Sequence, residues 1–443
     1  MTRFTTSTTS TLAFLVISFA LIPSSSAGVR LCSLPNSYKP SLNDTCVKMG
    51  GSTVTVNAAR GEIEAGVVLI DNSGGSSINS IGLQILWDAG TAPTGVEVID
   101  PFLVTYMHTE KSPRYEASAT GWFADALIPW PTGGAPLNEQ LTAWINFRVA
   151  ATAVPGTYTG TIISLPAADA ALPFTLNIYA MTIPTLGDSP FNTVYAFSDS
   201  ILSTVYDAAT VNLTATKFAY LDALAALRFP SINIYAQAPL SIDEYQYLAA
   251  QGVQILILAD ISGLPFGEGG VSPLTTTTTK RGSARFPEGD EKGEKRSVKG
   301  ERRAQACPTY TQSYIDKMVA FLKPTFDNLT ALGLQNRATV YGFDEIDASC
   351  EPAVRQLFSA AKSAFPGVRT LSAIDWPTVP LDLPLDVWVL QYQLVDPAVT
   401  IPWVAAGHEL YTYHCIEPHQ AAYLNTFNEV SLIQARLLFW VRN

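Results

Sequence analysis

Two adjacent carboxylates, Asp344 and Glu345, close an apolar stretch that begins at Ala338. The Val, Tyr and Phe side chains before them suit a buried β-strand, but strand formation gives no reason for two acids at its end. In parallel α/β barrels, catalytic side chains stand at the carboxyl ends of strands, where loops form a cleft over a packed core. Such a pair could carry out acid–base catalysis. The alternative is an ordinary helix start, capped by Asp347 or Ser349.

Alternating strands and helices after residue 185 would position this pair. Seven strands are predicted, at Asn192–Phe197, Ser231–Ala236, Val253–Ala259, Ala338–Phe343, Arg369–Ile374, Val387–Tyr392 and Glu409–Cys415. Helical spacing of apolar residues predicts helices over Thr216–Arg228, Asp243–Ala250, Thr311–Leu334, Ala353–Phe365, Thr400–Gly407 and Val430–Trp440. This alternation is typical of a (β/α)8-type barrel. We expect the eighth strand to be missing, because the chain ends at Asn443, just after the helix that should lead into it.

Short strands without intervening helical patterns fill residues 52–184, which predicts an N-terminal β-sandwich. A turn at Pro155 opens one alternating strand, and Pro173–Met181 is expected to pair with it as a hairpin. The predicted fold class is therefore multidomain, β plus α/β. The expected division is a β-sandwich domain over 28–185 and a βα-barrel catalytic domain over 186–443.

The amino-acid composition and net charge of the chain indicate which classes of ligand it can bind. The chain has 443 residues, 47% of them hydrophobic and only 15% charged, with a net charge of −11. That charge argues against nucleic acid or an anionic membrane as a partner, because both would repel it. The low charge and the 10% of aromatic residues suit neutral, hydroxyl-rich ligands. Residues 266–306 hold a threonine run and a dense charged run with few apolar side chains, so we expect a disordered insertion there.

Residues 1–27 read as a secretory signal peptide, with a basic start, a short apolar run and a small-residue cleavage site. No later run is apolar and long enough to span a bilayer, so a secreted or luminal protein is expected. Three glycosylation sequons, at Asn43, Asn212 and Asn328, fit that route.

Five cysteines leave at least one unpaired within the chain. Cys32 and Cys46 are expected to form a disulfide, Cys307 and Cys350 are a possible second pair, and Cys415 would be left over. The cysteines and histidines show no metal-ligand spacing, so we predict no metal and no cofactor.

Several stretches in this order resemble glycoside hydrolase family 123, the exo-acting β-N-acetylgalactosaminidases. They are Arg60–Glu62, Val154–Gly160, Tyr341–Glu345, Tyr411–Cys415 and Ala435–Trp440. The resemblance spans most of residues 50–443 and implies an N-terminal β-sandwich followed by a barrel catalytic domain. Two features depart from the family: Ile346 stands where the family often has proline, and the family continues into an eighth strand.

The resemblance implies substrate-assisted hydrolysis of terminal β-linked N-acetylhexosamine, with N-acetylgalactosamine as the expected sugar. Glu345 would be the general acid and then the general base, and Asp344 would hold the acetamide N–H of the sugar. Adjacent side chains of a regular strand point to opposite faces. The strand must therefore end or twist at Asp344 if both carboxylates are to reach one sugar.

Aromatic residues near the predicted strand ends are candidates for substrate binding. They are Tyr341, Trp376, Tyr392 and Tyr413. A sugar ring could stack on such side chains, or its hydroxyls could bond to them. The alternative for each is a packing role in the core or at the rim. We expect His414 to face the outer helices, and we assign no role to His408.

Two rival hypotheses remain. The chain could be a non-catalytic carbohydrate-binding or cell-surface protein that keeps the fold. It could also be a glycosidase for sugars without a 2-acetamido group, which would need a second carboxylate at about 5–5.5 Å in a retaining mechanism. Asp375, at another strand end, is the candidate for that carboxylate. The partner in every case is a glycan or glycoconjugate, and the sequence predicts no oligomeric state.

Overall fold

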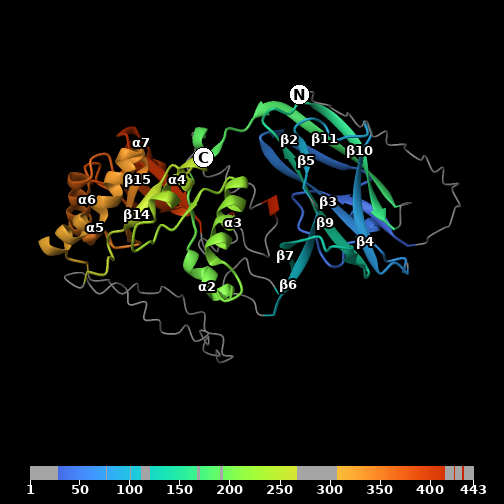
Figure 1. The fold of residues 1–443 in the computed structure, drawn as a ribbon, viewed down its shortest axis with the longest axis horizontal. Coiled ribbons are helices and arrows are strands. Elements are labelled where there is room, and N and C mark those ends of the chain that lie inside the picture. Colours follow the sequence, from blue (N-terminus) through green and yellow to red (C-terminus); the bar gives the residue numbers. More distant parts are fainter. Residues whose placement is uncertain are drawn as a thin grey trace, which may run out of the picture.

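The computed structural model describes residues 28–75, 77–99, 101–110, 120–166, 170–189, 193–266, 307–414, 424 and 432–433. These residues form a pair of packed β-sheets, followed by a parallel sheet with helices around it (Figure 1). Each of the two parts encloses a hydrophobic core of its own. The predicted signal peptide, Cys415, the predicted insertion beyond Phe266 and nearly all of the last predicted helix lie outside the described residues.

The first part is a β-sandwich of two sheets. One sheet runs β1-β3-β9-β6-β7, with β5 beside β9, and the other runs β2-β11-β10-β4-β8. Their bounds are β1 (Arg30–Leu34), β2 (Val54–Arg60), β3 (Glu62–Asp71), β4 (Ser80–Trp87), β5 (Val96–Val98), β6 (Phe102–Thr109), β7 (Gly121–Pro129), β8 (Ala135–Pro136), β9 (Gln140–Val149), β10 (Gly156–Leu165) and β11 (Ala171–Thr182). Side chains from both sheets, including Ile145 and Leu176, are fully buried between them.

The predicted hairpin is confirmed, since β10 and β11 pair antiparallel with Tyr158 opposite Leu176. The stretch Val96–Tyr106, for which the sequence predicts one strand, instead belongs to two strands, β5 and β6. Pro101 lies at the break, where its lack of an N–H prevents it from donating to a strand ladder. The sequence pattern does not predict β1 and β7, which lie at the two edges of one sheet.

The second part contains all seven predicted strands near their predicted positions. Five of them form one parallel sheet in the order β14 (Leu256–Asp260), β15 (Ala338–Asp344), β16 (Arg369–Ala373), β17 (Val387–Gln391) and β18 (Glu409–Tyr413). The other two, β12 (Tyr195–Ala196) and β13 (Ser231–Ile232), form a separate parallel pair. All carboxyl ends within the five-stranded sheet therefore lie along the same edge.

The sequence predicts seven strands of a (β/α)8-type barrel that lacks its eighth, but the described residues form a half-barrel of five strands and a separate pair. Strand β13 is only two residues long, and among the described strands it pairs with β12 and not with β14. One backbone hydrogen bond, from the Asp260 N–H to the Ala236 carbonyl oxygen at 2.7 Å, joins the segment after β13 to β14. The position where an eighth strand would lie falls outside the described residues.

Helices surround the parallel sheet (Figure 1). They are α3 (Leu213–Ala226), α4 (Ile242–Ala250), α5 (Gln312–Ala331), α6 (Glu351–Ala364) and α7 (Pro397–Ala405), while α1 (Cys46–Met49) and α2 (Leu202–Val205) are single turns. Ser241 and Glu244 form a reciprocal capping box at the start of α4. Leu357 and Phe358 of α6 are fully buried in the same core as the strands. No helix in the described ranges is long and apolar enough to cross a membrane.

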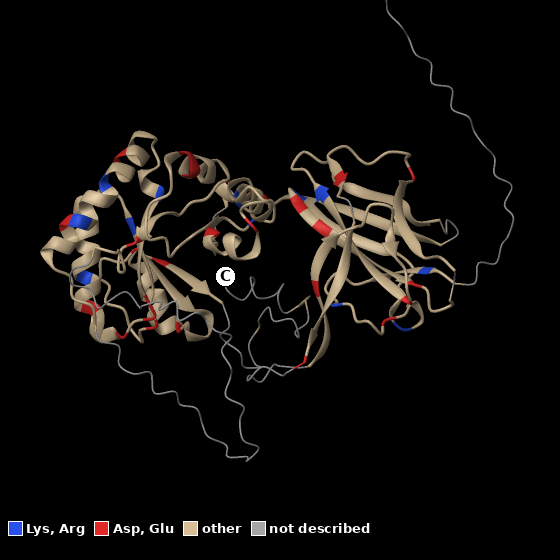
Figure 2. Cartoon of the chain, turned by 60° about the horizontal axis from the view of Figure 1, so that its bottom comes forward, with Lys and Arg blue, Asp and Glu red and all other residues tan. Residues whose placement is uncertain are grey.

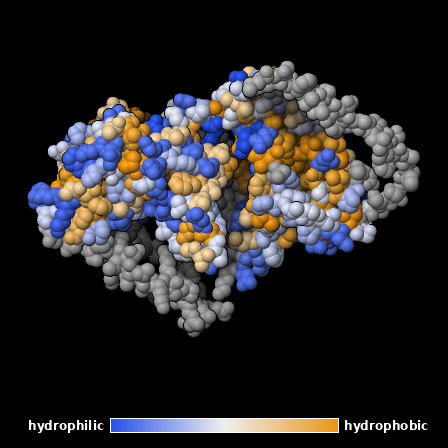
Figure 3. Space-filling model, viewed as in Figure 1, coloured by the Kyte–Doolittle hydropathy of each residue, from blue (hydrophilic) through white to orange (hydrophobic). Residues whose placement is uncertain are grey.

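Charged and apolar side chains are distributed unevenly between the two parts. Lysine, arginine, aspartate and glutamate are frequent on the helices around the parallel sheet and sparse on the sandwich strands (Figure 2). On the face seen in Figure 3, the larger hydrophobic areas lie over the sandwich. The boundary between the two domains at residue 185 stays our proposal, supported by this contrast and by the two separate cores.

Both predicted disulfides are present. Cys32 and Cys46 join β1 to α1, with their Cα atoms 5.7 Å apart. Cys307 and Cys350 join the chain just before α5 to the loop after β15, with a Cα separation of 5.1 Å. The second bridge therefore anchors the loop that directly follows the two carboxylates.

Arg228 of the second part hydrogen-bonds to the sandwich. Arg228, just after α3, has a φ of +64°. Its Nη2 donates to the carbonyl oxygen of Gly61 in the β2–β3 turn at 2.5 Å, and its Nη1 donates to the carbonyl oxygen of Pro184 in the connecting segment. The guanidinium thus spans the end of a helix, the connecting segment and a turn of the sandwich.

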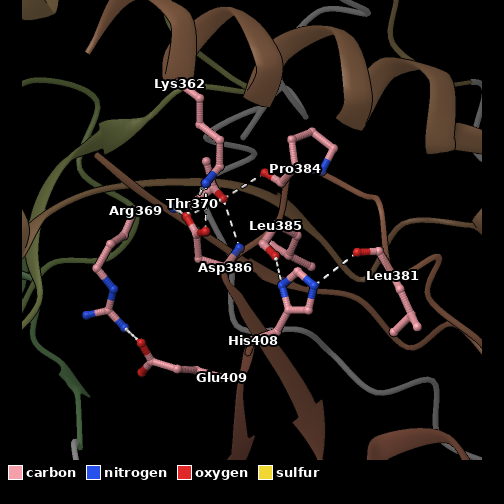
Figure 4. Close-up of polar contacts among 9 residues, drawn as sticks. All are labelled: Lys362, Arg369, Thr370, Leu381, Pro384, Leu385, Asp386, His408 and Glu409. Atoms are coloured by element: carbon pink, nitrogen blue, oxygen red, sulfur yellow. Dashed lines mark hydrogen bonds and ion pairs between the residues drawn. The ribbon is translucent and has the colours of Figure 1, made fainter. Parts of the chain in front are cut away.

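At the amino-terminal edge of the parallel sheet, Asp386 is the centre of a polar network (Figure 4). Its carboxylate accepts hydrogen bonds from Lys362 Nζ at 2.6 and 2.7 Å, and from the Thr370 backbone N–H at 2.9 Å. Nearby, the His408 ring lies 3.0 Å from each of two backbone carbonyl oxygens and stacks on Trp403 at 3.9 Å. These contacts lie at the opposite end of the strands from Asp344.

Asp386→Ala is expected to lower the free energy of unfolding by about 1–3 kcal/mol, because the N–H of the fully buried Thr370 loses its acceptor. Asp382→Ala is the matched control, since it removes an ion pair with Arg355 in which the Asp382 side chain is 79% exposed. Such a surface pair contributes about 1 kcal/mol at most. Denaturant unfolding of both variants measures the difference, and equal losses would contradict the role assigned to Asp386.

Candidate active site

The end of β15 is bent by two residues in the left-handed region. Phe343 has a φ of +62° and Glu345 a φ of +50°, values that residues other than glycine rarely adopt. The pairing of β15 with β16 is irregular between Tyr341 and Asp344, so the regular alternation of side chains stops there. The twist at Asp344 predicted from the sequence is confirmed, and both Asp344 and Glu345 are exposed to solvent.

Two tyrosines surround Asp344. The Tyr341 hydroxyl donates to Asp344 Oδ1 at 2.8 Å, and the ring of Tyr235 meets that of Tyr341 edge-on with centroids 5.4 Å apart. The protein atoms around Asp344 raise the pKa of its carboxyl by desolvation. The two tyrosine hydroxyls lower that pKa, and the charge of Glu345 raises it. The net pKa is above the ordinary value, even though water reaches the side chain.

Side chains from β17 and β18 hold Glu345. The Tyr413 hydroxyl and Gln391 Nε2 both donate to Glu345 Oε1, at 2.5 and 3.1 Å. The Glu345 N–H donates to the Ala373 carbonyl oxygen at 2.7 Å. Among the described residues, both of these side-chain donors bond to Oε1 and none bonds to Oε2.

The tyrosines of the site are held in their neutral, donating form. Burial is the largest cause of the raised pKa of Tyr413, followed by its hydrogen bond to Glu345. Burial likewise raises the pKa of Tyr341, helped by the charge of Asp344. Burial raises the pKa of Tyr235 to about 12. Each hydroxyl therefore keeps its proton at neutral pH.

The structure corrects the sugar-stacking role expected for two of the aromatic residues. Tyr341 is 1% exposed and Trp376 is 4% exposed, so neither presents a ring face to a ligand. Tyr341 positions Asp344, and the Trp376 indole N–H donates to the Ile346 carbonyl oxygen at 2.8 Å. Sequence position places a residue at a strand end but does not show whether its side chain packs inward.

The other two expected aromatic residues differ in their placement. Tyr413 contacts Glu345 directly, as described above. Tyr392 is half-buried just beyond β17, and its hydroxyl donates to the carbonyl oxygen of Leu424. The role of Tyr392 in substrate binding stays a prediction.

The sequence pattern does not single out three residues of the site: Tyr235, Asp260 and Gln391. Asp260 ends β14, directly beside the strand that carries the carboxylates, and its pKa is raised by burial and by the charge of Asp344. Gln391 ends β17. Both stand at carboxyl ends of predicted strands, so the rule that selected Trp376 and Tyr413 could have found them.

Asp375, the alternative second carboxylate, is close enough to Tyr413 for its charge to raise the pKa of that hydroxyl. The described residues contain no group of three or more His, Cys, Asp or Glu side chains placed to hold a metal ion. The site thus has two exposed carboxylates from one bent strand, flanked by phenol and amide donors. This arrangement can exchange a proton with a ligand at Glu345 and bind an N–H group at Asp344.

No family model matches the sequence, and no curated protein matches it either. Among solved structures, the fold is similar to a family 123 glycoside hydrolase from Clostridium perfringens, from a study of glycolipid glycan hydrolysis. The TM-score is 0.63 at 12% identity, covering 94% of this chain and 76% of that one. A cell-surface chitinase from Paenibacillus has a TM-score of only 0.18 at 9% identity, covering 84% of this chain and 38% of that one. The chain therefore shares its fold with a family 123 glycoside hydrolase.

Proposed function

We propose that the protein is a secreted glycoside hydrolase that removes terminal β-linked N-acetylhexosamine, with N-acetylgalactosamine as the expected sugar. The bent end of β15 carries this proposal, because it presents Asp344 and Glu345 to solvent next to each other. The similarity in fold to a glycoside hydrolase over 94% of the chain supports it. The two disulfides suit an oxidising compartment, which supports secretion.

In the proposed mechanism, the acetamido carbonyl oxygen of the sugar attacks the anomeric carbon as the glycosidic bond breaks. Glu345 gives its proton to the departing oxygen, and Asp344 accepts a hydrogen bond from the acetamide N–H and stabilises the positive charge of the oxazolinium ion. Glu345 then takes a proton from water, whose oxygen attacks the anomeric carbon and reopens the ring. The sugar leaves with its original anomeric configuration.

The hydrogen bonds around the two carboxylates support these separate roles for Glu345 and Asp344. Tyr413 and Gln391 both bond to Oε1 of Glu345 and leave Oε2 to exchange the proton. Asp344 receives the Tyr341 hydroxyl on Oδ1, which orients the carboxylate at the end of the strand. The two carboxylates repel each other when both are ionised, so a proton on Glu345 favours the charged form of Asp344.

A pair of chromogenic substrates tests the proposal. The chain without residues 1–27 is expected to hydrolyse 4-nitrophenyl N-acetyl-β-galactosaminide and to leave 4-nitrophenyl β-galactoside intact, because only the first carries the acetamido nucleophile. A thiazoline analogue of the bicyclic intermediate should inhibit the reaction. Equal hydrolysis of both substrates would point to a protein nucleophile such as Asp375. No hydrolysis of either, with the sugar still bound, would favour a carbohydrate-binding protein.

Tyr413→Phe is expected to lower kcat by about 10- to 100-fold, because a hydrogen bond to a charged group contributes about 1.5–3 kcal/mol. Tyr158→Phe is the matched control, since its hydroxyl donates to a backbone carbonyl oxygen in the sandwich, that of Val154. Initial rates on the N-acetylgalactosaminide measure both variants. Equal rates for Tyr413→Phe and the wild type would show that Glu345 does not depend on this phenol.

A further inference from the structure

Both peptide groups of Phe343 are held by serines from the neighbouring strands. The Phe343 N–H donates to Ser262 Oγ at 3.2 Å, and the Ser262 residue follows β14. The Phe343 carbonyl oxygen accepts from Ser372 Oγ at 2.7 Å, and Ser372 lies in β16 with no exposed surface. The residue with the most unusual backbone in β15 is thus fixed on both sides of the strand.

Asp260 sets the direction of the first of these hydrogen bonds. Ser262 Oγ donates to Asp260 Oδ1 at 2.6 Å, and the Ser262 N–H donates to the same oxygen at 3.0 Å. The single hydroxyl proton of Ser262 is used in this way, so its oxygen is left to accept from Phe343. Asp260, Ser262 and Phe343 therefore form one chain of hydrogen bonds in which each donor has one acceptor.

The hydrogen bonds to Phe343 offset the cost of its backbone conformation. A left-handed backbone costs about 1–2 kcal/mol for a residue other than glycine, and both Phe343 and Glu345 adopt it. Such conformations persist only where the surrounding structure over-determines them, and they gather at functional sites. Without the two serine contacts, Phe343 would relax towards ordinary strand geometry, where Asp344 and Glu345 point to opposite faces.

We infer that Asp260, Ser262 and Ser372 are positioning residues for the carboxylate pair. They hold Phe343 in its left-handed conformation and thereby present Asp344 and Glu345 to the same ligand. None of the three needs to touch the substrate. The inference rests on the proposed function for its kinetic test, but its structural part, the backbone of Phe343, can be measured independently.

The kinetic test uses Ser372→Ala and Ser262→Ala. Each is expected to lower kcat by about 10- to 100-fold with KM nearly unchanged, because a misplacement of about 1 Å costs about 10²-fold in rate. Ser262→Thr keeps the hydroxyl and should restore most of the activity. Ser231→Ala is the matched control, since Ser231 is also buried and also donates to a backbone carbonyl oxygen, that of Phe229.

The outcomes separate this inference from the proposed function. If the wild type hydrolyses no N-acetylhexosaminide, the proposed function fails, and a crystal structure of Ser372→Ala decides the inference through the φ angle of Phe343. A φ that becomes negative supports it, and an unchanged φ overturns it. With an active wild type, an equal loss of kcat in Ser231→Ala, or undiminished kcat in both Ser372→Ala and Ser262→Ala, overturns the inference alone.

Discussion

Glu345→Gln is expected to lower kcat on β-N-acetylgalactosaminides with poor leaving groups, such as oligosaccharides, by about 10²–10⁴-fold. The amide cannot give a proton to the departing oxygen, and the other donors around it, Tyr413 and Gln391, point at Glu345 itself. The loss on 4-nitrophenyl substrates should be much smaller, because nitrophenolate leaves without protonation.

The substitution leaves the site otherwise intact. A glutamine at position 345 keeps the shape of the side chain, and its carbonyl oxygen can accept from Tyr413 as the carboxylate does. Single-turnover and steady-state rates on both classes of substrate measure the effect. Losses of equal size on the two leaving groups would remove Glu345 as the general acid and return it to an ordinary residue at the start of a helix.

Asp344→Asn is expected to lower kcat on both classes of substrate, by about 10²–10³-fold. Asp344 acts on the formation of the oxazolinium ion, a step that every substrate shares, and the loss of one stabilising group at a developing charge has about this effect. The thiazoline analogue should bind this variant more weakly than it binds Glu345→Gln. Selective loss on poor leaving groups alone would exchange the roles of the two carboxylates.

The same variant has an opposite effect on stability. The pKa of Asp344 in the folded protein is raised, chiefly by burial. A raised carboxyl pKa means that the folded state loses stability as the pH rises through that pKa, and that the protonated form carries no penalty below the ordinary value. Asparagine does not titrate, so Asp344→Asn should be more stable than the wild type at pH 7 and equal to it near pH 3. Thermal unfolding across this range measures the difference.

The strands around the site could be predicted because each is a short run of β-branched and aromatic residues between helical patterns. Ala338–Phe343 is typical, and the structure ends β15 one residue later, at Asp344. The need for a twist there could be predicted from the two adjacent acids. The contacts that hold the twist could not be predicted, because Ser262 and Ser372 are distant in sequence from Phe343. Nothing in their local surroundings marks them as its contacts.

Two failures have different physical causes. Trp376 was expected to bind sugar because it follows a strand, but a large apolar ring at a strand end can equally be buried under the next loop, as it is here. A continuous seven-stranded barrel wall was expected from the count of strands. Closure depends on strand length and stagger, and β13 is only two residues long. Neither burial nor stagger is encoded in a local pattern.

The contacts of Arg228 make the junction between the two parts unequally tolerant of substitution. The arginine donates to the backbone carbonyl oxygens of Gly61 and Pro184. These contacts therefore depend on the path of the main chain and not on the side chains at those positions. Substitutions in the connecting segment that keep this path leave both acceptors in place. Arg228→Lys also leaves both acceptors in place but removes the paired donors, since an ammonium group lacks the planar fork that reaches two acceptors at once. In a library of random variants, intolerance at this junction should concentrate at position 228 and at Gly61, whose φ of +78° favours glycine.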